Sequence, residues 1–124
     1  MRIRAVSVAG ANTLLGQHLL ARLVADPSVR IASLHDRLAL EAASLDVSTQ
    51  WQVDENVRQL LHEVPLLGPD APARAPVLLS FLPELGAQSI EAAHLARRTR
   101  VITHCEYARL TVPLALPGIT EIDP

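Results

Sequence analysis

The residues best placed to do chemistry form a turn near the start of the chain, within the segment from Arg2 to Gly16. An apolar run leads into Gly10, and Gly16 follows at the head of a helical pattern. Gly10 permits a tight turn, the amino end of the helix offers free N–H groups to a phosphate, and Gly16 lets helix and strand pack closely. This order and spacing predict a site for the phosphates of a nucleotide.

Between these glycines the chain departs from the usual dinucleotide-binding pattern. A third glycine normally lets the backbone touch the pyrophosphate, but Asn12 and Thr13 stand at that place, followed by Leu14. A β-branched Thr13 disfavours the backbone shapes that glycine allows, and its Cβ would intrude where a pyrophosphate sits. Its hydroxyl could instead donate to a phosphate. We therefore expect binding to be weakened rather than excluded.

An acidic and a basic residue follow the second expected strand, Val29–Leu34. In a dinucleotide-binding unit, an acidic residue about 20 residues past the glycines hydrogen-bonds the adenosine ribose, and a neighbouring arginine accommodates a 2′-phosphate. Asp36 and Arg37, which come after His35, stand where both roles would be filled. The alternative is that this pair forms only a solvated exit from the strand.

Four reactive side chains follow a later strand, Val101–Thr103: His104, Cys105, Glu106 and Tyr107. Ligands of open α/β sheets bind at the carboxyl ends of strands, and a cysteine with a histidine and a glutamate can supply a nucleophile and a base. Adjacent residues of an extended segment point to opposite faces, however, so His104 and Cys105 should not meet directly. A small buried role is favoured for Cys105, and these four remain weak catalytic candidates.

Hydrophobic periodicity and turn residues predict the elements that position these groups. Helices are expected over Leu14–Ala25, Asp54–Glu63 and Glu84–Thr99, with Leu38–Leu45 a short helix or a loop. After the first strand, which leads into Gly10, further strands are expected over Val29–Leu34, Val64–Leu67, Val77–Phe81, Val101–Thr103 and Val112–Leu116. A proline-rich loop covers Gly68–Pro76, and Pro117–Pro124 is expected to be an extended tail.

The same patterns predict which side chains face inward. The first helix places Gln17, Arg22 and Asp26 opposite its apolar face. The second is capped by Asp54 and is expected to bury Val57, Leu60 and Leu61; the third is expected to bury Ala87, Ile90 and Ala93 with help from Leu95 and Ala96. The alternation of strands and helices predicts a single α/β domain over residues 1–124, a Rossmann-like three-layer fold with a mostly parallel sheet.

Composition restricts the classes of function. The 124 residues are 49% hydrophobic, with Trp51, Phe81 and Tyr107 the only aromatic side chains, so the core must be aliphatic. The net charge of -2 argues against nucleic acid as a partner. Cys105 is the only cysteine, which excludes an internal disulfide and favours the cytoplasm, and no apolar run is long enough for a membrane span.

Metal binding is not expected. The histidines show no ligand spacing such as H-x-x-x-H, and His18 and His94 are expected on exposed or half-exposed helix faces. The five histidines are His18, His35, His62, His94 and His104.

Four segments resemble the amino-terminal NAD(P)-binding domain of the aspartate-semialdehyde dehydrogenase family. They read VAGANTLLGQHLLARL, IASLHDR, VLLSFLPELGAQSIEAA and RVITHCEYARLTVPLALPGI. They are similar to that family's V-x-G-A-T-G-x-V-G turn, its adenosine-phosphate arginine, its S-x-L-P turn and its V-I-S-N-x-S segment. The resemblance implies NADP as the cofactor. It implies a cofactor site formed by Gly10, Asn12, Thr13, Leu14, Gly16, Asp36, Arg37, Ser80, Leu82 and Pro83.

In that family the catalytic cysteine and histidine lie in a second domain, beyond the segment that Pro124 would match. The resemblance therefore implies that this chain is not a complete semialdehyde dehydrogenase on its own. The glycine replaced by Thr13, the asparagine replaced by His104 and the serine replaced by Glu106 are departures from the family pattern. Gly118 and Ile119 also replace its Glu-Val pair.

Three functions follow as hypotheses. The first is a stand-alone NADP-binding domain that depends on another chain for reaction. The second is a cofactor-free scaffold or interaction protein, and the third is a small repurposed enzyme using the residues from His104 to Tyr107. In each case we expect a homodimer or a complex with another protein chain, because an isolated domain of this family would expose apolar surface and a sheet edge.

Overall fold

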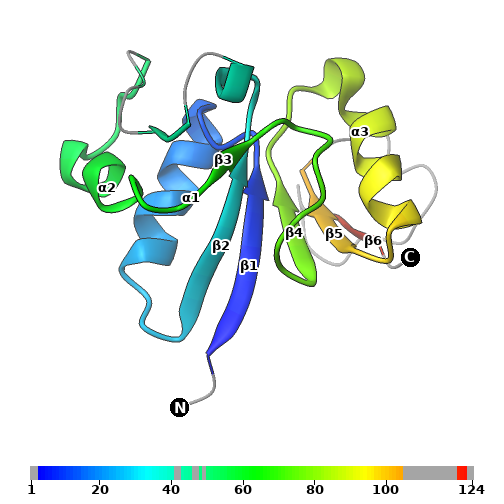
Figure 1. Cartoon of the computed structure of the whole chain (residues 1–124), viewed down its shortest axis with the longest axis horizontal. Coiled ribbons are helices and arrows are strands. Elements are labelled where there is room, and N and C mark those ends of the chain that lie inside the picture. Colours follow the sequence, from blue (N-terminus) through cyan, green and yellow to red (C-terminus); the bar gives the residue numbers. More distant parts are fainter. Residues whose placement is uncertain (1–2, 41–42, 46–47, 49, 105–119, 123–124) are drawn as a thin grey trace.

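The computed structural model describes residues 3–40, 43–45, 48, 50–104 and 120–122. The strands are β1 (Arg4–Ala9), β2 (Val29–His35), β3 (Leu66–Leu67), β4 (Val77–Ser80), β5 (Arg100–Thr103) and β6 (Thr120–Ile122). The helices are α1 (Leu14–Val24), α2 (Glu55–Leu60) and α3 (Glu84–Ala96), and a 3₁₀ helix covers Arg37–Leu40. Figure 1 shows how these elements are arranged. None of the described helices is long and apolar enough to cross a membrane.

The strands form one sheet in the order β3-β2-β1-β4-β5-β6. β1 to β5 run parallel, and β6 pairs antiparallel with β5. The chain therefore builds outward from β1 to β3 and then returns to the middle to place β4 against β1. This reversal puts the carboxyl ends of β1 and β4 side by side, where Ala9 is opposite Ser80. The predicted α/β fold with a mostly parallel sheet is confirmed.

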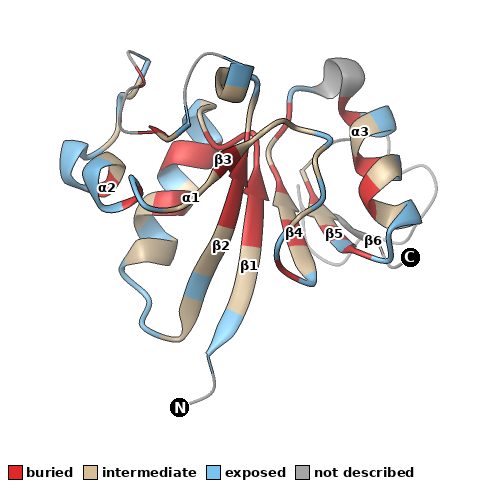
Figure 2. Cartoon of the chain, in the orientation of Figure 1, coloured by how far each residue is buried: buried red, intermediate tan, exposed pale blue. Residues whose placement is uncertain are grey.

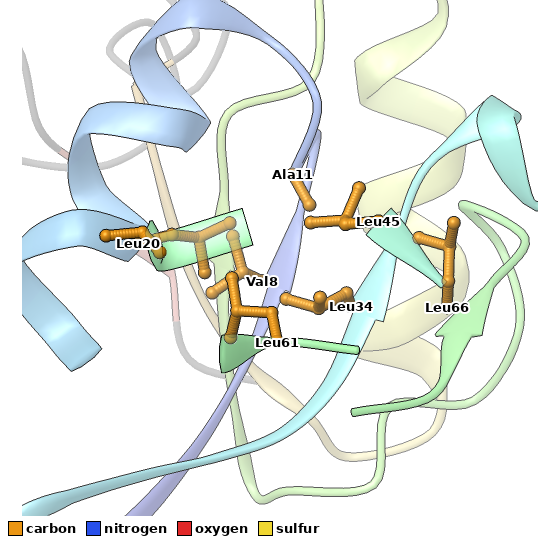
Figure 3. Packing of buried hydrophobic residues seen from close by; sticks show 8 residues of the cluster. Val8, Ala11, Leu20, Leu34, Leu45, Leu61 and Leu66 are labelled. Carbon is orange, nitrogen blue, oxygen red and sulfur yellow. The ribbon is translucent and has the colours of Figure 1, made fainter. Parts of the chain in front are cut away.

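Helices cover both faces of the sheet. Consecutive residues of a strand point to opposite faces, and Val8 packs in one core cluster with Leu20 of α1 while Ala9 packs in the other with Ala87 of α3. The larger cluster lies between the sheet, α1 and α2, and Figure 3 shows Leu34 within it. Burial concentrates in the carboxyl halves of β1 and β2 (Figure 2). The core therefore supports the carboxyl ends of these strands, where the glycine turn lies.

Four inward or outward assignments from the sequence are wrong. Leu60 is 65% exposed, because α2 is short and only the side that carries Val57 and Leu61 meets the core. Ala96 is exposed at the last residue of α3. Gln17 and His94 are instead buried, since each finds backbone hydrogen-bond partners inside the protein.

Element boundaries differ from the sequence prediction mainly where the pattern is weak. Only Leu66 and Leu67 of the expected strand Val64–Leu67 pair in the sheet. The expected strand Val112–Leu116 lies outside the described residues. Within the expected extended tail, Thr120–Ile122 forms β6, because it pairs with β5 at the edge of the sheet.

Two glycines are required by close packing at the turn after β1. Gly10 has a φ of 72°, and a Cβ there would lie 2.5 Å from the carbonyl carbon of Phe81. A Cβ on Gly16 would lie only 2.2 Å from the carbonyl oxygen of Gly10. The predicted close approach of helix to strand is therefore present, and it leaves no room for any side chain.

We expect Gly16→Ala to lower the free energy of unfolding by about 1–3 kcal/mol, since a methyl group would push α1 away from the backbone of the turn. The matched control is Gly68→Ala, where the nearest atom to a new Cβ is 3.6 Å away. This control should change stability by less than about 0.5 kcal/mol. Urea unfolding measures both, and equal losses would contradict the argument from close packing.

Candidate nucleotide site

Thr13 caps the amino end of α1. Its hydroxyl donates to the carbonyl oxygen of Gly10 at 2.7 Å and accepts from the N–H of Gly16 at 3.1 Å. Its φ of -72° and ψ of 159° are extended backbone that any residue adopts, so the turn has no need of glycine at this position. Because the hydroxyl hydrogen is directed at Gly10, the side chain serves the turn itself.

The first turn of α1 leaves two backbone donors available. The N–H of Gly16 is capped by Thr13 and that of Gln17 bonds the Thr13 carbonyl. Those of Leu14 and Leu15 have no acceptor among the described residues. Unpaired N–H groups at a helix amino end attract anions, because they point outward and the helix dipole is positive there.

Asp36 ties the end of β2 to the glycine turn. One carboxylate oxygen accepts from the N–H of Asn12 at 3.0 Å and the other from the N–H of Leu38 at 3.2 Å. The half-buried carboxylate is thus more than a solvated exit from the strand. Arg37, by contrast, is exposed, and within the described part of the chain its guanidinium makes no ion pair.

Gln17 fastens a loop segment to the glycine turn. Its Nε2 donates to the carbonyls of Asn12 at 3.0 Å and Gln50 at 3.2 Å. Its Oε1 accepts from the N–H groups of Gln52 at 2.8 Å and Val53 at 3.3 Å. These bonds use the full capacity of a carboxamide, which is why a polar side chain can be buried here.

The burial of Gln17 differs from the sequence prediction, although the sequence contains a signal for it. Gln17 lies three and seven residues before Leu20 and Val24, which puts it on the stripe of α1 that packs into the core. The prediction placed Gln17 outside because its side chain is polar.

Two cavities lie beside the glycine turn, at the carboxyl ends of the parallel strands, and Thr13 lines both. The first, of about 230 Å³, is mostly apolar. The second, of about 460 Å³, is more open and is lined largely by carboxamides. The first is lined by Thr13, Asp36, Arg37, Pro69, Leu82, Pro83, Ala87 and Ile90. The second is lined by Asn12, Thr13, Leu14, Gln17, Gln50 and Gln52.

The structure thus brings together most of the residues that the sequence placed at a cofactor site. Asp36 and Arg37 after β2 meet Leu82 and Pro83 after β4 around one cavity. Gly10 and Gly16, which shape the turn, line neither of the two cavities, and neither does Ser80. Ser80 is fully buried and donates to Glu91 of α3 at 2.6 Å, so it supports the end of β4 from within.

A third, smaller cavity of about 120 Å³ lies on the α1 side of β4 and β5 and is almost entirely apolar. His104 lines it, with its ring stacked on Phe81 at 5.5 Å between centroids and its Nδ1 donating to the carbonyl of Ser80 at 3.2 Å. The remaining weak catalytic candidates, Cys105, Glu106 and Tyr107, lie outside the described residues. Elsewhere in the described ranges, no three potential metal-ligating side chains cluster.

His35, a buried histidine, directly precedes Asp36, which lines the first cavity. His35 donates from Nδ1 to the carbonyl of Gly68 at 3.0 Å, so its Nε2 accepts from the hydroxyl of Ser33 at 2.9 Å. Burial lowers the pKa of His35 below its usual range. The bond to Gly68 opposes this shift in pKa, and the electrostatic effects of His94 and Arg74 add to it.

Comparison with known proteins supports the fold. No family model matches the sequence, and no curated protein matches it. Among solved structures, the chain resembles aspartate semialdehyde dehydrogenase with NADP from Candida albicans, with a TM-score of 0.75 and 18% sequence identity. The match covers 88% of this chain and 31% of that one, so this chain spans about a third of the length of the dehydrogenase.

The buried His35 makes stability depend on pH. The unfolded chain takes up a proton near the ordinary value of 6.5, whereas the folded protein resists it. The stabilisation that the neutral His35 gives to the folded protein is therefore fully present above pH 6.5. It is lost as the pH falls below that value, and the free energy of unfolding decreases by at most about 1.4 kcal/mol per pH unit.

Urea unfolding between about pH 7.5 and about pH 5.5 measures this loss. His35→Asn keeps a donor near Nδ1 without titrating and should flatten the dependence, whereas His18→Asn, at an exposed position, should leave it unchanged. Identical slopes for the wild type and His35→Asn would refute the assignment.

Proposed function

We propose that this chain binds NADP as a nucleotide-binding domain, with the adenosine 2′-phosphate in the first cavity and the pyrophosphate at the amino end of α1. One observation carries the proposal. Asp36, Arg37, Leu82 and Pro83, from two loops far apart in the sequence, enclose a cavity at the point where the strand order reverses. Open α/β sheets bind ligands at that place.

The polar side of the first cavity suits a phosphorylated ribose. Arg37 has no ion pair with a described residue and is exposed, so its guanidinium is available for bidentate bonds to a 2′-phosphate. Asp36 keeps lone pairs beyond the two bonds it accepts and can receive a ribose hydroxyl. On the opposite side, Leu82 and Ile90 offer an apolar surface to a base.

The dimensions favour one part of the ligand per cavity. About 230 Å³ is below the range of ~300–1,000 Å³ usual for a pocket that encloses a whole ligand. Since Thr13 lines both cavities, a dinucleotide would cross it on the way from the first to the second. The N–H groups of Leu14 and Leu15, which have no acceptor among the described residues, would then meet the pyrophosphate.

NADP, when bound, supplies hydride transfer, and this chain's residues would hold and orient it. The aspartate semialdehyde dehydrogenase that this chain resembles is about three times as long as the matched region. We propose that this domain contributes the cofactor site and that the reacting groups lie outside the described residues.

A second candidate function, a cofactor-free interaction protein, is favoured by exposed apolar surface. Leu14 and Leu15 are 53% and 54% exposed at the start of α1. Leu19, one helical turn further on, lines the third cavity together with Phe81 and Ile102. Such a surface suits a partner chain or a second copy, and size-exclusion chromatography tests for self-association: a strict monomer at high concentration argues against a homodimer.

Calorimetric and thermal-shift titrations with NADP, NAD and ATP test the primary proposal. A ligand at 100 times its dissociation constant should raise stability by about 2.7 kcal/mol. Arg37→Ala should weaken NADP about tenfold or more, through loss of charged hydrogen bonds, and leave NAD nearly unchanged. Arg22→Ala, an exposed arginine on α1, is the matched control. No binding by the wild type, or equal effects of both variants, would refute the proposal.

Thr13→Gly tests the pyrophosphate position. Glycine at a helix cap costs only a few tenths of a kcal/mol relative to threonine, so the fold should persist. Without the Cβ, the backbone can approach the pyrophosphate, and we expect affinity for NADP to rise several-fold. An unchanged affinity would place the pyrophosphate elsewhere, whereas binding seen only in Thr13→Gly would favour the interaction protein.

A further inference from the structure

Two buried histidines hold neighbouring carbonyl groups of the same loop. His35 of β2 donates to the carbonyl of Gly68 at 3.0 Å, and His94 of α3 donates from Nε2 to that of Pro69 at 2.9 Å. Both side chains are fully buried, and their rings meet edge to face at 5.7 Å between centroids. Side chains from β2 and from the helix α3 thus bond one short stretch of backbone.

The protonation pattern shows what these rings contribute. A carbonyl oxygen only accepts, so the proton must be on Nδ1 of His35 and on Nε2 of His94. The other nitrogen of His35 is bonded to Ser33, but Nδ1 of His94 is buried without a hydrogen-bond partner among the described residues. An apolar side chain would avoid that cost of burial, so what the imidazole of His94 adds is its bond to Pro69.

The segment Gly68–Pro69, which these bonds hold, contributes Pro69 to the wall of the first cavity. Pro69 lines it together with Asp36, Arg37 and Leu82. The loop that contains Pro69 follows β3, whose two residues pair only with β2, so the sheet holds this segment weakly. Other attachments are the guanidinium of Arg97, which donates to the carbonyl of Asp70 at 2.7 Å, and the N–H of Arg74 on the Ser33 hydroxyl at 3.2 Å.

We propose that His35 and His94 are positioning residues that hold Gly68–Pro69 against the nucleotide cavity, and so set affinity for the adenosine end without touching it. This inference rests on the proposed nucleotide-binding function. A loop released from the two imidazoles would leave the base with one apolar wall fewer, and part of the binding energy would be spent on ordering that loop.

The experiment compares His94→Leu, which removes the donor, with His94→Gln, whose amide nitrogen can occupy the place of Nε2. Affinity for NADP is measured by calorimetry, well below the unfolding temperature of the weakest variant. His94→Leu should raise the dissociation constant about tenfold, the loss expected for one hydrogen bond, and His94→Gln should stay within about threefold of the wild type.

The matched control is Trp51→Phe. It also removes a ring N–H bond to a backbone carbonyl, that of Asp54 at 2.9 Å. Trp51, however, packs against the larger core cluster, between the sheet, α1 and α2, and it lines none of the three cavities. The substitution should lower stability and leave the dissociation constant unchanged. An unchanged dissociation constant in His94→Leu, beside a loss of stability, would show a merely structural role and overturn the proposal.

A second measurement separates this inference from the proposed function. The N–H of Ala71 bonds the carbonyl of Gly68 at 3.1 Å, so its hydrogen exchange reports on the loop without any nucleotide. Exchange at Ala71 should be faster in His94→Leu than in His94→Gln, even if the wild type binds no nucleotide, and equal rates would overturn the positioning role.

If His94→Leu does not fold, Arg97→Ala removes an exposed attachment of the same loop. It should speed exchange at Ala71 and raise the dissociation constant about threefold. No change in either would equally overturn the proposal.

Discussion

The close approach of α1 to the turn after β1 is the constraint on which the rest of this structure depends. Gly16 lies so near the carbonyl of Gly10 that no side chain fits between them. This contact directs the amino end of α1 at the reversal of strand order, and the cap by Thr13 closes the same turn. Leu14, whose N–H has no acceptor among the described residues, lines the second cavity because helix and strand meet at this distance.

Buried polar side chains on each face of the sheet fasten loops to this framework. On the α1 side, Gln17 holds the loop segment at Gln50 against the glycine turn. On the α3 side, His35 and His94 hold the loop after β3, while Ser80 and Thr103 bond the buried carboxylate of Glu91. Because hydrogen bonds to backbone groups are directional, Gln17, His35 and His94 each fix the position of a loop more closely than apolar packing would. The cavity walls are therefore set by residues that lie behind them.

The likeness to a solved dehydrogenase at 18% identity establishes the fold, and the cavity residues carry the argument for function. A glycine turn alone is a weak signal, since many α/β proteins need close packing there. The combination is more specific: an unpaired Arg37 among the described residues, a half-buried Asp36 and an apolar surface after β4 converge on one cavity. Thr13 is compatible with the backbone of the turn, and it lines both cavities.

From the sequence alone came the order of the helices and the parallel strands, the central strand, expected over Val77–Phe81 and found over Val77–Ser80, the glycine turn, and the adjacent Asp36 and Arg37 after the second strand. These follow from periodicity, turn chemistry and strand ends, which act between residues close together in the chain. Only the tertiary structure decided that Gln17 and His94 are inside, that Ser80 faces Glu91 and that Pro69 joins the cavity. A polar side chain is buried where the folded protein supplies a hydrogen-bond partner. Apart from Asn12, which lies five residues from Gln17, those partners lie 11 to 36 residues away along the chain.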